Sequence, residues 1–285
     1  VMSQVFYEPN KLVSLATKHE KEKAIRLPFK AGLGLSVIVP GEIETDALGT
    51  FSGEIERCGT PREVLIRKAR LGMKLTNLPL GTASEGTFAP HPLMPFATAD
   101  HEIMIFIDDE RELELVEQII SYDVKALQEN FSQFNNVPDF LRRTDFQRHA
   151  VIVRPENRTD LIFKGLQTLD AVNEAFDICR EVSKRRAVQI ETDLRAHLNP
   201  TRMKVIRKLA VKLVRRLENA CPGCNAPGFG IVAVDKGLPC QWCNSPTEIV
   251  RAEIFGCAVC NYKEEKSDLA PDDFADPRFC DFCNP

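Results

Sequence analysis

The first 220 residues alternate between short apolar runs with strand periodicity and longer segments with helical periodicity. Strands are predicted where apolar and β-branched residues cluster and turn signals such as Pro40-Gly41 stop the run. The predicted strands cover 12–17, 33–40, 80–88, 101–109, 150–155 and 187–198. This alternation is typical of an α/β fold, in which flanking helices cover a layered mixed sheet.

Helical periodicity marks several of the segments between these strands. Helices are predicted over 60–75, 113–127, 169–182 and 200–219. The first carries a capping signal, with Thr60 before it and Glu63 three residues later. The last opens with Asn199 as a cap and Pro200 in the first turn. These signals fix the start of two helices more firmly than periodicity alone.

Composition and charge then narrow the class of protein. Hydrophobic residues make up 44% and charged residues 27% of the 285 residues, as in ordinary globular chains. The apolar runs fall far short of the roughly 20 residues that span a bilayer, and no secretory signal pattern is present near residue 1. A formal net charge of −4 disfavours nucleic acid or an anionic membrane as a partner. We therefore expect a cytoplasmic protein, and a homodimer stays open.

Eight of the ten cysteines form four C-x-x-C pairs near the end of the chain. The pairs are Cys221/Cys224, Cys240/Cys243, Cys257/Cys260 and Cys280/Cys283. A two-residue spacer lets two thiolates contact one tetrahedral Zn²⁺, so four pairs predict two four-cysteine zinc sites. The spacing favours joining the first pair to the second and the third to the fourth, and a crossed arrangement stays open. With no ligand position left for water, both zinc ions are expected to be structural.

Asparagine follows every cysteine pair, which supports a metal site over a disulfide framework. The four residues are Asn225, Asn244, Asn261 and Asn284. Asparagine tolerates the left-handed backbone that the turn of a zinc knuckle favours. The short strand-like runs between the pairs predict a tandem zinc ribbon over 220–285, following an α/β domain over 1–219. The acidic end of the ribbon favours contact with a protein rather than with a nucleic acid.

A hydroxyl group and several basic side chains gather where the first strand meets the first helix. These residues are Thr17, Lys18, His19 and Lys21. The N-terminus of a helix offers backbone N–H groups to an anion, and the lysines add charge that suits phosphate. Lys68 and Arg70, on the helix over 60–75, supply further positive charge. The pattern favours a nucleotide or another phosphorylated small molecule as ligand.

Carboxylates from separate segments predict a magnesium site beside these cations. Glu56 precedes the helix over 60–75, and Glu85 lies among small residues in ASEGTF. Mg²⁺ accepts such oxygen ligands and keeps several waters. Strand alternation over 187–198 places four polar residues on one face as the wall of a site, namely Glu191, Asp193, Arg195 and His197.

The same elements resemble the inosine/xanthosine triphosphate pyrophosphatase family, over about 12–110 and more loosely over 187–218. The likeness lies in Ala16-Thr17-Lys18-His19, in TPREVLIRKAR after Glu56, in Ser84-Glu85-Gly86, and in Thr201-Arg202 of the last helix. It implies an α/β fold with a nucleotide cleft. The resemblance implies that Glu56 and Glu85 act on magnesium and in catalysis, and we expect Asp193, from the polar face over 187–198, to assist them. It implies nucleotide binding by Thr17, Lys18, His19, Lys68, Arg70 and Arg202, and the local patterns described above add Lys21 and His197.

Over its whole length the chain resembles an uncharacterised bacterial family, a domain of unknown function with a C-terminal double zinc ribbon. The likeness is carried by TFSGEIER, ASEGTF, ETDLRAHLNPTRM and the four terminal cysteine pairs. It implies no activity.

The first hypothesis for function is a magnesium-dependent hydrolase of a nucleoside triphosphate or a related nucleotide. The second is a nucleotide-binding or sensing protein without turnover, and the third is a zinc-ribbon adaptor for a protein or a nucleic acid. Release of pyrophosphate separates the first two hypotheses, and nucleotide binding separates both from the third.

Overall fold

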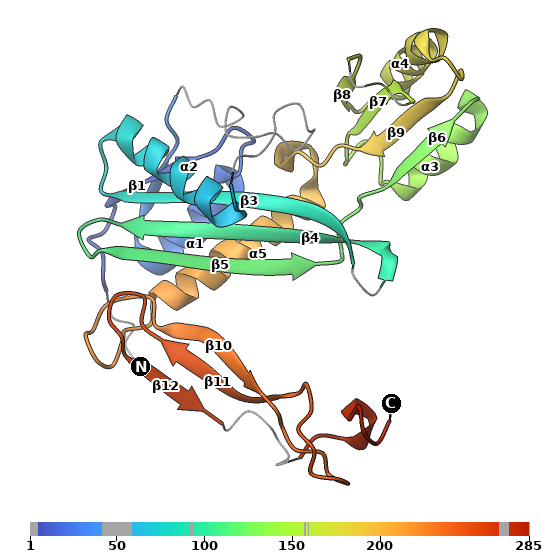
Figure 1. The fold of residues 1–285 in the computed structure, drawn as a ribbon. Helices are drawn as coiled ribbons and strands as arrows, with labels where there is room; N and C mark the ends of the chain where they lie inside the picture. The colour runs from blue at the N-terminus through green and yellow to red at the C-terminus, as the bar shows by residue number, and fades with distance from the viewer. Residues whose placement is uncertain are drawn as a thin grey trace.

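The computed structural model describes residues 5–41, 59–91, 94–156, 158, 160–267 and 274–284. Their strands form three sheets, and the first sheet lies between the other two (Figure 1). Helices flank the first two sheets, so the predicted mixed α/β class is confirmed. No helix within the described ranges combines the length and the apolar content that crossing a bilayer requires.

The first sheet combines parallel and antiparallel pairing. In spatial order its strands are β2 (Ser36–Ile38), β1 (Leu12–Ala16), β3 (Leu80–His91), β4 (Met94–Asp108) and β5 (Leu113–Ser121). β1 runs parallel to β2 and β3, whereas β3, β4 and β5 are antiparallel. The strands predicted over 12–17, 33–40, 80–88 and 101–109 are all present. Pairing of β1 with β3 ends at Ala16 and Ala83, and β3 continues beyond this point.

The prediction of a helix over 113–127 is wrong, because β5 occupies most of this segment. Leu113, Leu115 and Glu117 are buried, and the residues between them are more exposed, as in a strand. The left-handed backbone of Glu112 (φ 53°) helps to turn the chain back onto β4. The apolar residues in this stretch fit both the helical period and the two-residue period of a strand. Pairing with β4 along the whole of β5 favours the strand.

Helices cover both faces of the first sheet. α1 (Glu22–Leu33) and α5 (Pro200–Leu217) pack on one face and share its main core, whereas α2 (Pro61–Thr76) packs on the other. The predicted caps are confirmed: the backbone N–H of Glu63 donates to Thr60 Oγ1 over 3.3 Å, and that of Arg202 donates to Asn199 Oδ1 over 3.0 Å. Both helices therefore begin at the predicted residues.

The second sheet is antiparallel and has a core of its own. Its strands, in spatial order, are β6 (Gln128–Phe131), β9 (Val188–Thr192), β7 (Val151–Pro155) and β8 (Phe163–Leu166). α3 (Val137–Arg143) and α4 (Leu169–Val182) complete this unit, and α4 confirms the helix predicted over 169–182. The predicted strand over 150–155 corresponds to β7.

The strand predicted over 187–198 is too long. β9 ends at Thr192, and Ala196–Leu198 form a 3₁₀ turn, η3, immediately before the Asn199 cap of α5. The prediction that Glu191, Asp193, Arg195 and His197 share one strand face is therefore wrong. Asp193 ends the alternation because its carboxylate accepts hydrogen bonds from the backbone and side chain of Arg195, which bends the chain locally.

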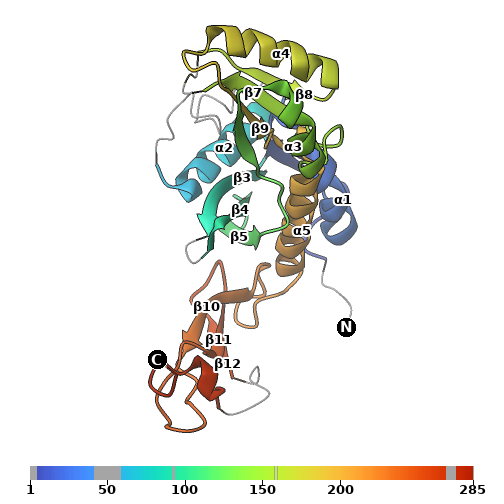
Figure 2. The same ribbon diagram turned by 90° about the vertical axis from the view of Figure 1, so that its right-hand side faces the viewer.

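The third sheet is the C-terminal ribbon. It consists of the antiparallel strands β10 (Gly230–Lys236), β11 (Val250–Gly256) and β12 (Lys263–Lys266), at the end of the molecule opposite the second sheet (Figure 2). Arg216, near the end of α5, joins it to the first sheet. The guanidinium of Arg216 donates to Gly228 O over 3.2 Å and pairs with Glu117 of β5 over 2.6 Å.

Candidate functional site

The eight paired cysteines form two tetra-cysteine clusters. The inner cluster, which follows α5, contains Cys221, Cys224, Cys257 and Cys260, and the outer cluster contains Cys240, Cys243, Cys280 and Cys283. In each cluster all four sulfur atoms lie within 4.8 Å of one another. The cysteines are therefore grouped in the number that one structural zinc ion requires.

Sulfur–sulfur distances show that the clusters suit a metal ion rather than disulfides. Cys221 and Cys260 are 3.7 Å apart, Cys224 and Cys257 3.6 Å, Cys240 and Cys283 3.9 Å, and Cys243 and Cys280 3.6 Å. Four sulfurs in a tetrahedron about 2.3 Å from one Zn²⁺ lie roughly 3.8 Å from one another. A disulfide would need about 2.0 Å. The donor set and its spacing fit two Zn²⁺ ions.

The predicted pairing of the knuckles is wrong, and the crossed alternative is confirmed. The first pair joins the third, and the second joins the fourth. The cause is the ribbon sheet: Gly230 of β10 pairs with Gly256 of β11, which brings the residues just before β10 beside those just after β11. The second cysteine pair lies at the other end of this hairpin, where Cys240 forms a bridge with Ala275. The spacing of the cysteines along the sequence cannot show which pairs the hairpin brings together.

Backbone geometry around the cysteines is that of zinc knuckles. Asn225 (φ 61°) and Asn244 (φ 58°) adopt the predicted left-handed backbone, whereas Asn261 does not. Backbone N–H groups donate to sulfur, for example Gly223 to Cys221 Sγ over 3.4 Å and Val259 to Cys257 Sγ over 3.3 Å. Such bonds stabilise thiolates, the form in which cysteine binds zinc.

A second candidate site lies at the carboxyl end of β1, where six charged side chains are buried together. We call it the charged cluster. Its members are Lys21, Lys68, Glu85, Asp100, Glu102 and Arg202. Four of them, Glu102, Arg202, Glu85 and Lys68, act electrostatically on Lys21. Sheets with parallel strands commonly bind ligands at the carboxyl ends of those strands.

Lys21 reaches this end of the sheet from the loop between β1 and α1. Its ammonium group donates to the backbone oxygen of Ser84 over 2.9 Å and to Ser84 Oγ over 3.1 Å. Ser84 is the first β3 residue beyond the pairing with β1. Burial lowers the pKa of Lys21 to about 8, although the carboxylate of Glu102 opposes this effect. The side chain therefore still carries its charge at neutral pH.

Arg202 and Glu102 form a fully buried ion pair on the same face of the sheet. The guanidinium Nε of Arg202 donates to Glu102 Oε1, and Nη1 donates to Leu194 O over 2.6 Å. Both side chains have no exposed surface. Gly86 lies directly beneath them, and a Cβ atom there would overlap both Glu102 and Arg202. The glycine of ASEGTF is thus the residue that lets this pair form.

Asp100 is the member of the charged cluster with the fewest polar partners. It lies two residues before Glu102 on β4, on the same face, and opposite Phe88 of β3. Its side chain is 0% exposed, and neither carboxylate oxygen accepts a hydrogen bond from an N–H group or a hydroxyl of the described residues, although the carboxyl group interacts with that of Glu102. Burial and the nearby charge of Glu102 raise the pKa of Asp100 to about 7. Two carboxylates so placed are stable only if they share a proton or hold a cation.

The ion pair of Lys68 and Glu85 lies on the opposite face of β3. Glu85 stands opposite Ile103, whereas Ser84 and Gly86 stand opposite Met104 and Glu102, so successive β3 side chains point to different faces. Lys68 comes from α2, and its ammonium group contacts Glu85 Oε1. Thr17, at the end of β1, is buried, and its Oγ1 has no partner among the described residues. The site therefore spans both sides of β3 beyond the end of β1.

The structure brings only some of the predicted residues to this site. Thr17, Lys21, Lys68, Glu85 and Arg202 lie there. Lys18 is exposed nearby, at the second residue after β1. His19 stacks on His197, with ring centroids 5.3 Å apart. These two rings, half-buried at His19 and exposed at His197, form an aromatic surface between the β1–α1 loop and η3.

Other predicted residues have different partners. Arg70 forms exposed ion pairs with Asp109 and Glu114 near the start of β5. The carboxylate of Asp193 pairs with Arg195 and accepts the backbone N–H of Gly165 over 3.1 Å. Glu56 lies outside the described residues.

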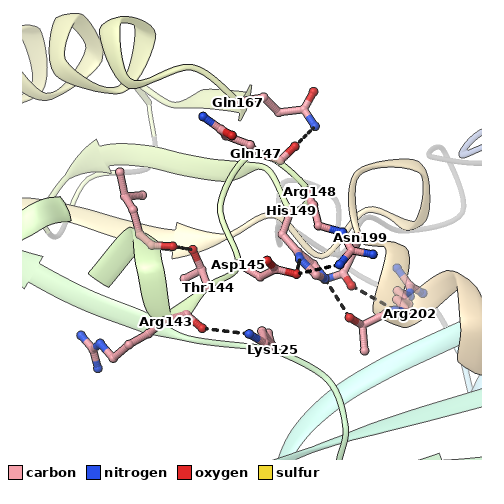
Figure 3. A network of polar contacts seen from close by, with 12 residues as sticks. Lys125, Arg143, Thr144, Asp145, Gln147, Arg148, His149, Gln167, Asn199 and Arg202 are labelled. Carbon is pink, nitrogen blue, oxygen red and sulfur yellow. Dashed lines mark hydrogen bonds and ion pairs between the residues drawn. The ribbon is translucent and has the colours of Figure 1, made fainter. Parts of the chain in front are cut away.

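A polar network links the second sheet to the start of α5, next to Arg202 (Figure 3). His149 is buried, its Nε2 lies 2.8 Å from Thr201 Oγ1, and its Nδ1 lies 3.7 Å from Asp145 Oδ2. Burial lowers the pKa of His149, so the ring is neutral at pH 7. The contact fixes the first turn of α5, which carries the Arg202 guanidinium into the charged cluster.

Sequence reasoning missed Asp100 and Glu102. A signal was present, because period-two alternation places residues 100, 102, 104 and 106 on one face of β4. Met104 and Phe106 on that face are core residues with no exposed surface. Two carboxylates in line with core positions indicate either strain or a site.

The fold and the clusters define a class: an α/β protein with a buried charged cluster and a ribbon bearing two tetra-cysteine clusters. Comparison with known families then identifies its family. The model of a domain of unknown function, DUF6671, matches residues 68–285, which is more than half of the chain. The protein belongs to this family. None of the curated proteins and none of the solved structures compared with the chain matches it.

Proposed function

We propose that the protein is a divalent-metal-dependent hydrolase of a nucleoside triphosphate or a related nucleotide, with the charged cluster as its centre. The observation that carries this proposal is the carboxylate of Asp100, which is fully buried beside the carboxyl group of Glu102 and accepts no hydrogen bond from an N–H group or a hydroxyl in the described part of the chain. Leaving such a group unpaired costs several kcal/mol, and stability alone gives no reason to keep it.

A hard cation fits this position. One oxygen of Glu102 is bound by Arg202, while Oε2 has no partner among the described residues. This oxygen and the two of Asp100 offer the oxygen ligands that Mg²⁺ prefers. Bound there, Mg²⁺ would neutralise the carboxylates and polarise a phosphate oxygen. The sequence patterns predicted Glu56, Glu85 and Asp193 for this role, but Glu85 lies on the opposite face of β3, where it pairs with Lys68.

Lys21 and Arg202 supply the positive charge that a phosphate chain needs. Both lie on the α1/α5 face, and the first turn of α5 beside Arg202 adds backbone N–H groups. In the proposed reaction a water oxygen bonds to the α-phosphorus while the bond to the β-phosphate oxygen breaks. Pyrophosphate then leaves toward Lys21. Positioning and charge neutralisation by these side chains account for most of the lowered barrier.

One observation favours a second candidate, a nucleotide-binding protein without turnover. Lys68 contacts Glu85, so the carboxylate that the pyrophosphatase resemblance places in catalysis is already neutralised. A protein that holds nucleotide at Lys21, Arg202 and the His19–His197 surface without hydrolysing it would need no free Glu85.

For the ribbon we propose two structural Zn²⁺ ions, one in each tetra-cysteine cluster. The division into a nucleotide-binding part over 1–219 and a zinc-binding part over 220–285 belongs to this proposal. A reducing compartment, the cytoplasm, is the proposed location, since eight cysteines grouped as thiolate ligands persist there.

The experiment is release of pyrophosphate from standard and deaminated nucleoside triphosphates, with and without Mg²⁺. We expect metal-dependent release that falls at least a hundredfold in Asp100→Asn and in Glu102→Gln. The matched control is Asp109→Asn, an exposed carboxylate farther along the same stretch of chain. Nucleotide binding without release would favour the second candidate. Release that both variants retain in full would exclude the charged cluster as the catalytic centre.

A further inference from the structure

The outer tetra-cysteine cluster carries the most exposed aromatic side chains of the described residues. Trp242 is 77% exposed and Phe282 is 78% exposed, and Phe279 and Phe274 are also largely accessible. Trp242 and Phe282 occupy the same place in their knuckles, the third position of C-x-x-C. Because their cysteines share one cluster, both rings lie at one tip of the ribbon.

The inner cluster shows that a knuckle does not require exposed aromatic residues. Gly223 and Val259 hold the equivalent positions there. The ring of Tyr262 packs against Gly223, leaving only 3.1 Å between a Cβ atom at this position and the ring. Tyr262 in turn contacts Phe229, with ring centroids 5.8 Å apart. In the inner cluster the ring of Tyr262 thus packs against a knuckle and Phe229, whereas Trp242 and Phe282 of the outer cluster are far more exposed to solvent.

Negative charge predominates in the stretch of sequence that carries Phe274, Phe279 and Phe282. Residues 267–285 contain five aspartates and one basic residue, Arg278. Their net charge of −4 equals that of the whole chain, so residues 1–266 are balanced. Arg278 is already paired with Asp276 over 2.8 Å. Asp281, next to Phe282, is exposed and forms no hydrogen bond or ion pair with the described residues.

We propose that the tip formed by Trp242, Phe282 and Asp281 binds a cationic segment of another protein, rich in lysine or arginine. Aromatic faces attract ammonium and guanidinium groups and also pack against the aliphatic stems of these side chains. The aspartates attract the same groups and raise the rate of encounter. Trp and exposed Phe are also the residue types on which binding energy concentrates at protein interfaces.

A nucleic acid fits this tip less well. Exposed rings can stack on bases, but single-strand binders combine such rings with a positively charged groove. Here the carboxylate of Asp281 stands next to Phe282 and repels phosphates. This inference stands apart from the proposed hydrolase activity, because it concerns the opposite end of the molecule.

Trp242 makes the test direct, since it is the only tryptophan of the chain. Its emission is measured on the full-length, zinc-loaded protein while decalysine or deca-arginine is added. We expect the emission to change saturably as the peptide binds. The dissociation constant of the peptide should rise when NaCl is increased from about 50 to about 500 mM, because salt screens ionic contacts over this range. A decamer of thymidine and deca-glutamate serve as comparison ligands.

Two matched variants distinguish binding at the tip from a general attraction of cationic peptides to an acidic protein. Phe282→Ala keeps the Trp242 reporter and is expected to weaken decalysine binding about fivefold, the loss of one exposed cation–π contact. Val259→Ala, at the equivalent position of the inner cluster, should leave the affinity within about twofold. Zinc content is measured for both. An unchanged emission with either cationic peptide, equal losses in the two variants, or tighter binding of the thymidine decamer would each overturn the proposal.

Discussion

The tetra-cysteine clusters and the charged cluster gather polar side chains in opposite ways. In the ribbon, two neighbouring cysteines on one turn supply half of each cluster, and a second C-x-x-C pair completes it. In the charged cluster, the side chains come from α2, α5, β3, β4 and the loop after β1, and the fold itself buries them. The spacing of residues along the sequence therefore indicates the tetra-cysteine clusters, whereas only tertiary packing creates the charged cluster.

The two regions also differ in how they affect stability. Metal binding to thiolates releases free energy that becomes folding free energy for the ribbon. Burying Asp100, Glu102 and Arg202 costs free energy, because only well-placed partners compensate a charged group for the loss of its hydration. A metal site stabilises its surroundings, and an incompletely paired charged cluster weakens them until a ligand binds.

Removing the metal should have the largest effect. Structural zinc contributes on the order of 10 kcal/mol or more to a small zinc domain, so a chelator should unfold the ribbon while the first two sheets persist. Hydrogen exchange located along the sequence measures this. Protection lost across 230–266 alone agrees with the expectation, and protection retained there would show that the ribbon folds without metal.

The crossed pairing can be tested on the same protein. Replacing Cys221 and Cys257 together by Ser removes two ligands of one cluster, so the zinc content should fall from two ions per chain to one. Under the sequential pairing predicted from spacing, the same double variant would damage both clusters. Metal analysis returning no zinc would therefore contradict the arrangement in the structure.

The buried ion pair should give the next largest effect. Arg202→Met leaves Glu102 buried without its cation and should destabilise the fold by about 3–5 kcal/mol. Arg251→Met, which breaks an exposed pair with Asp235 in the ribbon, should change stability by less than about 1 kcal/mol. Denaturant unfolding compares the two variants. Equal losses would mean that the charged cluster is solvated.

Asp100→Asn should stabilise the protein, by an amount that depends on pH. Because its pKa is raised to about 7, the folded chain holds this proton more tightly than the unfolded chain does. The stability it contributes is complete below about pH 4 and is lost as the pH rises through 7. The asparagine variant has no carboxyl group at this position to ionise, so its stability does not fall in this way. Its advantage should reach on the order of 4 kcal/mol at pH 8 and nearly disappear at pH 4, as thermal unfolding at both pH values would show.

The sequence predicted local features far better than distant contacts. The Thr60 and Asn199 caps are set by residues within three positions, and both predictions are confirmed. Segment 113–127 and the knuckle pairing were predicted wrongly, because a partner strand decides each of them. Strand β5 forms against β4, and the hairpin of β10 and β11 exchanges the cysteine pairs.

The charged cluster was predicted in part for the same reason. Lys21, Lys68, Glu85 and Arg202 stand in recognisable local patterns, so their chemistry was visible. Asp100 and Glu102 are separated from Arg202 by about a hundred residues and carry no motif. The Arg202–Glu102 ion pair, and the overlap that a side chain at Gly86 would create with it, show how closely β3, β4 and α5 approach one another.

The most direct test of the account is a thermal unfolding titration with Mg²⁺ and a nucleoside triphosphate, on the wild type and on Asp100→Asn at pH 8. A ligand at 100 times its Kd adds about 2.7 kcal/mol of stability. The pair of ligands is expected to raise the Tm of the wild type. The same ligands should leave the Tm of Asp100→Asn unchanged, although this variant is the more stable of the two without ligand. Equal increases in both proteins, or none in the wild type, would contradict the claim that the charged cluster is a cation and phosphate site.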